Sequence, residues 1–187
     1  MEVVSLAIPE VKLITPQRFG DDRGFFTETW NQQRFVDAGL DLDFVQDNHS
    51  FSKDVGVLRG LHFQSPPFAQ DKLVRVVTGA VYDVAVDIRK GSPTYGQYVG
   101  AELTAENGAQ LLVPKGFAHG FVTLTENTSF LYKVTALYSP ENDHGIMWND
   151  PDIAVEWPLP ENGPQLSGKD TTLPRLSDIE SPFTYEV

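Results

Sequence analysis

Two side chains suited to chemistry, Arg59 and His62, lie inside an otherwise apolar stretch at residues 57–64 (VLRGLHFQ). A guanidinium can bind phosphate, and an imidazole can exchange a proton near neutral pH. The Val, Leu and Phe neighbours favour a β-strand, whose alternation predicts Arg59 on one face and His62 with Gln64 on the other. Buried polar groups need partners. Either neighbouring loops satisfy both groups structurally, or the two belong to a functional site.

A second polar stretch occupies residues 46–50 (QDNHS), directly after Phe44 and Val45. The two aromatic and β-branched residues favour the start of a strand, but the five polar residues do not continue an apolar face. Such a run forms a solvated loop or lines a pocket, and the sequence permits both.

Short strand-forming segments separated by turn residues make up most of the chain, which contains 15 Gly and 13 Pro. We expect strands at residues 11–14, 25–30, 57–64, 72–77, 80–87, 95–103, 110–113, 119–124 and 129–136. One short helix is expected at 32–38, with Asn31 as its N-cap and Gly39 at its end. Thr78 and Gly79 are typical of a hairpin. This pattern predicts an all-β sandwich or barrel with few short helices.

The composition limits the classes of protein to which the chain can belong. A chain of 187 residues that is 41% hydrophobic fits a single globular domain. The net charge of -12 and the lack of a basic run argue against nucleic acid and membrane surfaces as partners. The absence of Cys excludes disulfides, thiolate nucleophiles and iron–sulfur clusters. No signal peptide or membrane-spanning run is apparent, so we expect a cytoplasmic protein.

Two segments resemble the two motifs of the cupin superfamily. The positions that correspond to the first motif are Gly56, His62, Gln64, Lys72 and Gly79. Those that correspond to the second are Gly108, Pro114, Gly116, His119 and Thr123. The second motif matches at every position but the last. The resemblance implies a single cupin-type jelly roll over residues 1–187, in which His62 and His119 face the same cavity.

The departures from the cupin motifs concern metal binding. Metal-binding cupins hold the ion with His and Glu side chains, but Gln64 and Lys72 occupy two of those positions here. A protonated Lys cannot act as a ligand and repels a divalent cation. His62 and His119 alone fall below the usual number of ligands in a tight site. We therefore expect no metal, with the charge of Lys72 in its place.

A closer resemblance, which runs from about Leu6 to Asp170, is to the dTDP-4-dehydrorhamnose 3,5-epimerase family. The similar segments are residues 21–26, 44–50, 57–64, 72–75, 114–121, 130–133, 138–140 and 148–151. The resemblance implies an isomerase without a cofactor. Its reaction inverts C3 and C5 of dTDP-4-dehydro-6-deoxy-D-glucose and gives dTDP-4-dehydro-L-rhamnose.

This reaction needs a base, a positive group for an enolate, and an acid on the opposite face of the sugar ring. The resemblance implies that His62 is the base and that Asp170, its partner, sets the imidazole tautomer. It implies that Lys72 stabilises the enolate oxygen. It assigns the proton donor to Tyr132, because a phenol can give a proton without starting ionised.

The resemblance also implies a set of substrate-binding residues: Phe19, Arg23, Glu28, Gln46, Asn48, Arg59, His119, Tyr138, Asp143 and Lys169. Arg and Lys suit the diphosphate, and aromatic rings suit stacking on the base. Members of the family are homodimers whose N-terminal strands pack on the neighbouring chain. The resemblance therefore places Arg23 and Glu28 in the site of the partner.

Three other functions stay open at the level of sequence. A single-centre epimerase, acting at C3 or C5 alone, can keep the same His, Asp and Lys. A cupin that binds sugar nucleotides without catalysis would not require a base and an acid on opposite faces. A metal-dependent cupin oxygenase would need ligands beyond His62 and His119.

Overall fold

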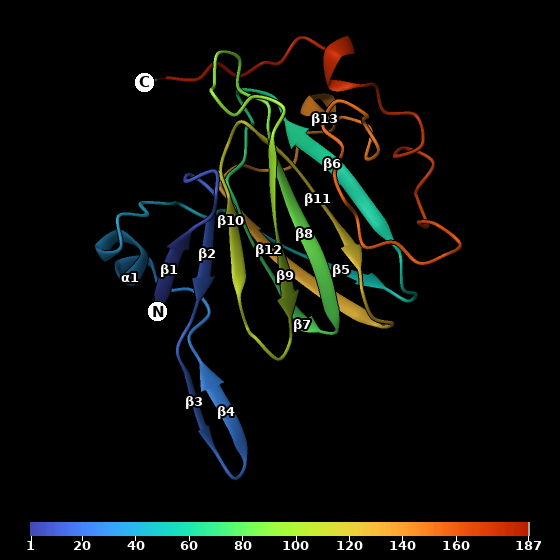
Figure 1. The fold of residues 1–187 in the computed structure, drawn as a ribbon. Coiled ribbons are helices and arrows are strands. Elements are labelled where there is room, and N and C mark those ends of the chain that lie inside the picture. Colours follow the sequence, from blue (N-terminus) through green and yellow to red (C-terminus); the bar gives the residue numbers. More distant parts are fainter. Residues whose placement is uncertain (187) are drawn as a thin grey trace.

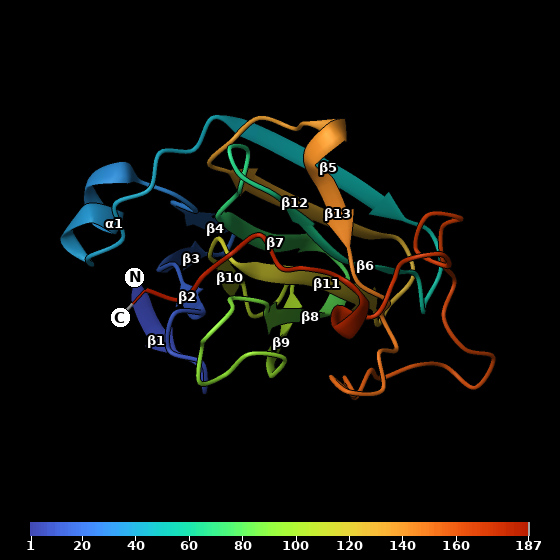
Figure 2. The ribbon, with the colours of Figure 1, turned by 90° about the horizontal axis from the view of Figure 1, so that it is seen from above.

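The computed structural model describes residues 1–186, which form two antiparallel sheets packed face to face (Figures 1 and 2). The six-stranded sheet has the order β1 (Glu2–Ser5), β2 (Lys12–Thr15), β10 (Gln110–Val113), β7 (Lys72–Thr78), β12 (Thr128–Val134) and β5 (Gln46–Ser52). The five-stranded sheet has the order β13 (Asp143–Gly145), β6 (Leu58–Gln64), β11 (Phe117–Thr123), β8 (Ala80–Asp87) and β9 (Tyr98–Thr104). From β6 onward, the chain crosses repeatedly between the sheets. The predicted all-β jelly roll is confirmed.

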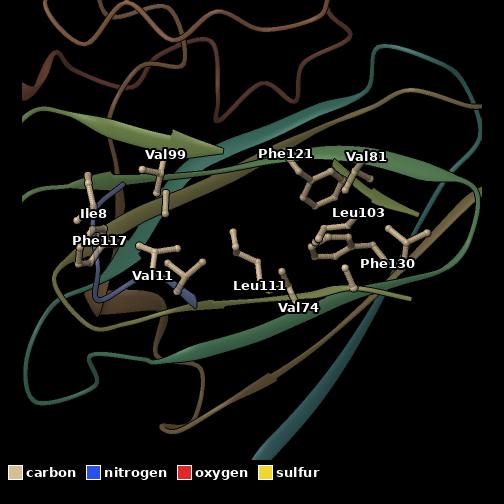
Figure 3. Close-up of a cluster of buried hydrophobic side chains, with 14 residues drawn as sticks. Ile8, Val11, Val74, Val81, Val99, Leu103, Leu111, Phe117, Phe121 and Phe130 are labelled. Atoms are coloured by element: carbon tan, nitrogen blue, oxygen red, sulfur yellow. The ribbon is translucent and has the colours of Figure 1, made fainter. Parts of the chain in front are cut away.

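Apolar side chains fill the space between the sheets (Figure 3). The six-stranded sheet contributes Val74 and Leu111, and the five-stranded sheet contributes Val81 and Phe121, all less than 5% exposed. Removal of such side chains from water is the main force that holds two sheets together. Phe121 and Phe130 of this cluster also line the cavity described below, together with polar residues.

The remaining elements lie outside the sandwich. Strands β3 (Arg18–Asp21) and β4 (Gly24–Thr27) form a hairpin that extends away from the body of the molecule (Figure 1). Helix α1 (Gln32–Asp37) packs Phe35 into a small cluster with residues of the six-stranded sheet. Two 3₁₀ helices, Pro140–Asn142 and Leu176–Asp178, complete the fold. Within residues 1–186, no helix has the length and apolar character needed to cross a membrane.

The predicted helix is confirmed, one residue shorter than expected, and its cap is the expected one. The Asn31 side-chain oxygen accepts a hydrogen bond from the Arg34 backbone N–H at 3.1 Å. Gly39 follows the helix with a φ of 79°, a left-handed conformation that favours glycine. Both signals are local, which explains why they could be recognised without the fold.

Two predictions about strands were wrong. Thr78 and Gly79 do not form a hairpin, because β7 and β8 belong to different sheets and the turn carries the chain across the sandwich. The strand expected at 25–30 ends at Thr27, where the chain leaves the projecting hairpin and runs to the cap of α1. Strands β1, β3 and β13, which had not been predicted, also form.

The polar run at 46–50 is a strand and not a loop. In β5, Gln46, Asn48 and Ser50 are half-buried and alternate with exposed residues. Ser50 lines the polar cavity, so the pocket interpretation holds for this residue. Pairing with β12 gives β5 its structure despite the polar composition.

Candidate active site

A polar cavity of about 250 Å³ lies between the two sheets. Its lining consists of Ser50, Arg59, His62, Lys72, His119, Phe121, Phe130, Tyr132, Ser167 and Asp170. Strands of both sheets contribute, together with the C-terminal segment that carries Ser167 and Asp170. The prediction that His62 and His119 share a cavity is confirmed.

His62 and Asp170 form the shortest contact in the cavity, although 108 residues separate them. His62 Nε2 lies 2.5 Å from Asp170 Oδ1, and the Ser167 hydroxyl donates to Asp170 Oδ2 at 2.8 Å. Burial favours the neutral acid, but the hydrogen bonds from His62 and Ser167 outweigh it and hold the pKa of Asp170 below its ordinary value. An ionised Asp170 accepts the Nε2 proton of His62, which leaves Nδ1 free to take up another proton.

Arg59 and His62 line the same cavity, so their predicted placement on opposite faces was wrong. Along β6, His62 pairs with His119, but Arg59 pairs with Phe121, and the register shifts between these positions. Gly60 has a φ of 139° at this shift. The irregularity interrupts the alternation of side chains and brings residues three positions apart to one side.

Lys72 enters the cavity from β7 in the six-stranded sheet. It is 9% exposed and donates to the backbone carbonyl of His62 at 3.3 Å. Burial lowers the pKa of Lys72 to about 8, and the nearby carboxylates of Asp143 and Asp83 oppose this effect. The ammonium therefore keeps most of its charge at neutral pH, without a carboxylate in direct contact among residues 1–186.

His119 is held by a carboxylate that the sequence did not single out. Its Nε2 lies 2.9 and 3.0 Å from the two oxygens of Asp83, which is fully buried on β8. The only available signal was an acidic residue within the apolar strand 80–87. Ser167 was also missed, because a serine in a loop carries no distinctive pattern.

Tyr132 lies on β12, on the wall opposite His62. The side chain is partly buried beside Phe130, and its ring centroid lies 6.1 Å from that of Phe130. Burial raises the pKa of the phenol above its ordinary value. Within the described chain, its hydroxyl makes no hydrogen bond, so it can serve a bound molecule.

Several predicted binding residues form a second cluster, linked by hydrogen bonds, next to the cavity. Gln46 donates to Asn48 at 2.8 Å and accepts from the backbone N–H of Tyr138 at 3.0 Å. Asp143 accepts from the Tyr138 hydroxyl at 3.1 Å and from Lys169 at 2.6 Å. Asn48 is the strand partner of Tyr132, and Lys169 precedes Asp170, so both segments adjoin the cavity.

Three predicted binding residues lie elsewhere in the chain. Phe19 and Arg23 belong to the projecting hairpin, where Arg23 contacts Asp21 and its side chain is 89% exposed. Glu28 pairs with Arg34 of α1 at 3.0 Å. The structure therefore does not bring these residues into the cavity of their own chain, and their role stays a prediction.

The donor set around the cavity is unlike that of a metal centre. The Gln64 amide donates to the backbone carbonyls of Phe68 and Leu137 and accepts from the Ser139 N–H, so it serves the fold. Within residues 1–186, no three His, Cys, Asp or Glu side chains gather in an arrangement that could hold a metal. His62 and His119 are each bonded to a carboxylate, and Lys72 adds a repelling charge.

Comparison with known proteins assigns the chain to a family. The family model described as dTDP-4-dehydrorhamnose 3,5-epimerase matches residues 5–178. The chain belongs to this family. The predicted family, the isomerase class and the cupin-type fold are thereby confirmed.

Individual members of the family are similar over nearly their whole length. The dTDP-4-dehydrorhamnose 3,5-epimerase of Salmonella typhimurium is 56% identical, over 94% of this chain and 96% of the relative. A Legionella pneumophila dTDP-6-deoxy-D-glucose-3,5-epimerase, solved with dTDP-4-keto-L-rhamnose, has a TM-score of 0.95 and 46% identity, with 100% and 99% of the two chains covered. A 3'-monoepimerase from Streptomyces bikiniensis, solved with dTDP-quinovose, has a TM-score of 0.86 and 32% identity, with 92% and 87% covered.

Proposed function

We propose that the protein converts dTDP-4-dehydro-6-deoxy-D-glucose to dTDP-4-dehydro-L-rhamnose by inverting C3 and C5. We also propose that it works as a cytoplasmic homodimer of single jelly-roll domains and needs no cofactor. The observation that carries the catalytic proposal is the placement of His62 and Tyr132 on opposite walls of one cavity, with Lys72 between the sheets beside them. Family membership supplies the substrate class.

His62 removes the proton from the carbon next to the C4 ketone. Its Nε2–H donates to Asp170, which fixes the tautomer and leaves Nδ1 as the basic nitrogen. The carboxylate also stabilises the imidazolium that forms when Nδ1 takes up the proton. Asp170 is in turn held by Ser167, so the pair is oriented before substrate binds.

Lys72 stabilises the negative charge that proton removal places on O4. A preorganised cation in a buried site is worth more than the same cation in water. Its low exposure serves this role, and the depressed pKa still leaves it charged below about pH 8. Loss of its charge would remove the enolate partner while leaving the base in place.

Tyr132 returns a proton to the other face of the ring. It projects from the six-stranded sheet, whereas His62 projects from the five-stranded sheet, so a sugar between the sheets meets both. Burial keeps the phenol protonated through neutral pH. Inversion follows because the acid and the base act on opposite faces of the same carbon.

The nucleotide occupies the polar groups that adjoin the cavity. Arg59 bonds weakly to the Phe51 carbonyl at 3.3 Å and is exposed, which leaves most of its donors for the diphosphate. Lys169 adds a second cation, Gln46 and Asn48 add amides, and Tyr138 offers an exposed ring for stacking on the base. Phe19, Arg23 and Glu28 act in the site of the partner, which agrees with their absence from the lining of the cavity in their own chain.

The test is incubation with dTDP-4-dehydro-6-deoxy-D-glucose in deuterated water, followed by NMR of C3 and C5. Deuterium and inversion should appear at both carbons, and His62→Ala should lose about 10²- to 10⁴-fold or more in both. Full turnover should survive exhaustive treatment with a chelator.

A product inverted at one carbon would instead establish single-centre epimerisation. The similarity to a 3'-monoepimerase supports this as the second candidate function. Tight binding of the sugar nucleotide without deuterium exchange would indicate a binding protein without catalysis. Metal-dependent turnover would indicate a different cupin chemistry.

A further inference from the structure

Asp83 is a fully buried carboxylate that the proposed steps do not use. Both of its oxygens lie within 3.0 Å of His119 Nε2, at 2.9 and 3.0 Å. Nearly equal distances to the two oxygens fit a single N–H directed between them. An ionised carboxylate can only accept, so this geometry assigns the His119 proton to Nε2.

The pairing of β8 with β11 explains why the two residues meet. His119 lies opposite Ala85, and Asp83 lies opposite Phe121, so the His and the Asp are diagonal neighbours on the same face. The His119 ring also stacks on Phe130 across the cavity, with centroids 6.3 Å apart and planes at 22°. The imidazole is thus held on one side by an aromatic ring and at Nε2 by a carboxylate.

Asp83 has few groups that offset the cost of its burial. Burial raises the pKa of Asp83, while His119 and the nearby charge of Lys72 oppose that rise. An ionised carboxylate among the apolar side chains of β8 lowers the stability of the folded protein. That cost is explained if the carboxylate serves the residue to which it is bonded.

We propose that Asp83 is a positioning residue, which holds the His119 ring in one orientation and in its Nε2–H tautomer. Nδ1 then remains as the ring nitrogen for the bound sugar, and in the neutral ring it accepts a hydrogen bond. His119 therefore meets a sugar hydroxyl as a hydrogen-bond acceptor. The effect on turnover rests on the proposed epimerase function, whereas the tautomer does not.

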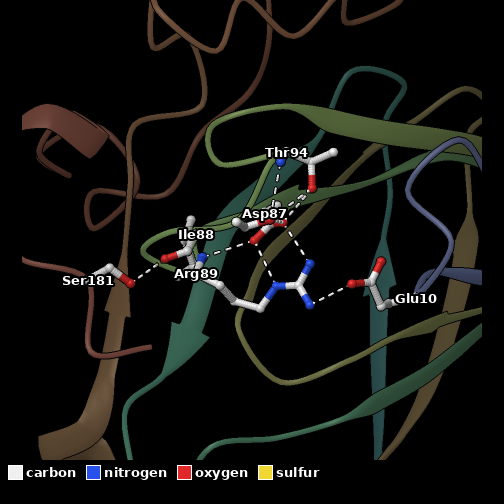
Figure 4. Close-up of polar contacts among 7 residues, drawn as sticks. Glu10, Asp87, Ile88, Arg89, Thr94 and Ser181 are labelled. Carbon is white, nitrogen blue, oxygen red and sulfur yellow. Dashed lines mark hydrogen bonds and ion pairs between the residues drawn. The ribbon is translucent and has the colours of Figure 1, made fainter. Parts of the chain in front are cut away.

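The chain offers a matched control four residues further along the same strand. Asp87 is also fully buried, but Arg89 binds both its oxygens, at 2.9 and 2.7 Å, and Thr94 also donates to it (Figure 4). This group lies outside the lining of the catalytic cavity. Asp87→Asn therefore tests the general effect of removing a buried charge from β8.

The experiment compares wild type, Asp83→Asn and Asp87→Asn by ¹⁵N NMR of the His119 ring and by steady-state kinetics. Wild type should show the Nε2–H tautomer. Asp83→Asn should show a changed tautomer population, with kcat lowered roughly 10- to 100-fold, comparable to the loss seen when the partner that orients a metal-binding His is removed. Asp87→Asn should lower the unfolding midpoint and leave both the His119 spectrum and kcat per folded molecule unchanged.

The wild-type spectrum keeps the inference testable even if Asp83→Asn does not fold. An Nδ1–H tautomer in wild type would overturn it, as would an unaltered His119 spectrum in Asp83→Asn. Equal losses of kcat in Asp83→Asn and Asp87→Asn would also overturn it, because the effect would then belong to the packing of β8. If wild type failed to turn over the substrate, the proposed function would fall, and the spectra would still decide the role of Asp83.

Discussion

At the scale of single residues, the assignment of the acid depends on one hydroxyl group. His62 alone can remove a proton and return it to the same face, which gives exchange without inversion. A donor on the opposite wall completes the change, and the Tyr132 hydroxyl has no competing hydrogen bond within residues 1–186.

Tyr132→Phe should separate exchange from inversion. The variant keeps the ring that packs beside Phe130 and removes only the proton donor. We expect deuterium to enter the substrate at C3 or C5 while inverted product falls by about 10²- to 10⁴-fold. NMR of the sugar after incubation in deuterated water measures both. Inversion at the wild-type rate would remove Tyr132 from the acid role, and loss of exchange as well would assign it to binding or enolate stabilisation.

Lys72→Met should lower the activity of the protein and raise its stability. Burial lowers the pKa of Lys72 from 10.5 to about 8, which corresponds to about 3 kcal/mol of unfavourable burial at neutral pH. The variant should therefore lose epimerisation but gain about 1–3 kcal/mol in the free energy of unfolding at pH 7. Urea denaturation and the deuterium assay check the two parts.

The pH dependence gives Lys72→Met a distinctive signature. The folded protein releases the Lys72 proton near pH 8, and the unfolded chain releases it near pH 10.5. Between these values the unfolded chain binds more protons, so wild-type stability rises with pH and the advantage of the variant should shrink. A variant less stable than wild type at pH 7, or an advantage independent of pH, would contradict the burial argument.

At the scale of elements, the irregular pairing of β6 with β11 decides which side chains reach the cavity. A Cβ built on Gly60 would lie 2.6 Å from the Gly120 Cα and 3.0 Å from the His119 carbonyl oxygen. Both neighbours are backbone atoms of the paired strand, which cannot move aside as a flexible side chain could.

Gly60→Ala should therefore damage both stability and the site. The added methyl group forces β6 away from β11, and the φ of 139° is itself unfavourable for alanine. We expect a loss of about 1–3 kcal/mol or more in the free energy of unfolding, with reduced activity in the folded fraction. Gly91→Ala is the control, since Gly91 also has a positive φ but no atom within 4 Å of its added Cβ. An equal loss in both variants would show that the conformation alone matters, and not the strand contact.

At the scale of the whole molecule, the projecting hairpin of β3 and β4 bears on assembly. Phe19, Phe25 and Phe26 are each more than half exposed on it. An isolated two-stranded hairpin is marginally stable, and exposed aromatic residues indicate a contact surface. Both facts favour a hairpin that packs on a second copy of the chain.

A mixing experiment tests whether Arg23 acts in the site of the partner. Arg23→Ala and His62→Ala should each be inactive or weak alone. Dimers containing one chain of each should regain one working site, because the Arg23→Ala chain keeps His62 and receives Arg23 from the other chain. Light scattering checks the dimer, and the deuterium assay checks the rescue. A monomer with full activity, or mixed dimers without rescue, would contradict the exchange of Arg23 between chains.

The sequence by itself determined the local structure and the family. Strand-forming segments, the Asn31 cap and Gly39 act over a few residues, so they could be recognised one at a time. His62 and His119 fall at positions of the cupin motifs, with Lys72 in the Glu position after a longer spacer, and longer segments carry the family resemblance. The jelly roll and the membership of the epimerase family followed from these patterns.

Only the tertiary structure decided how distant segments meet. The turn at Thr78 and Gly79 has the composition of a hairpin, but the two strands that it joins find partners in opposite sheets. Asp83 reaches His119 through strand pairing, and the register shift on β6 places Arg59 beside His62. The physical reason is that side-chain direction in a strand depends on register, and register is set by contacts between segments far apart in the chain.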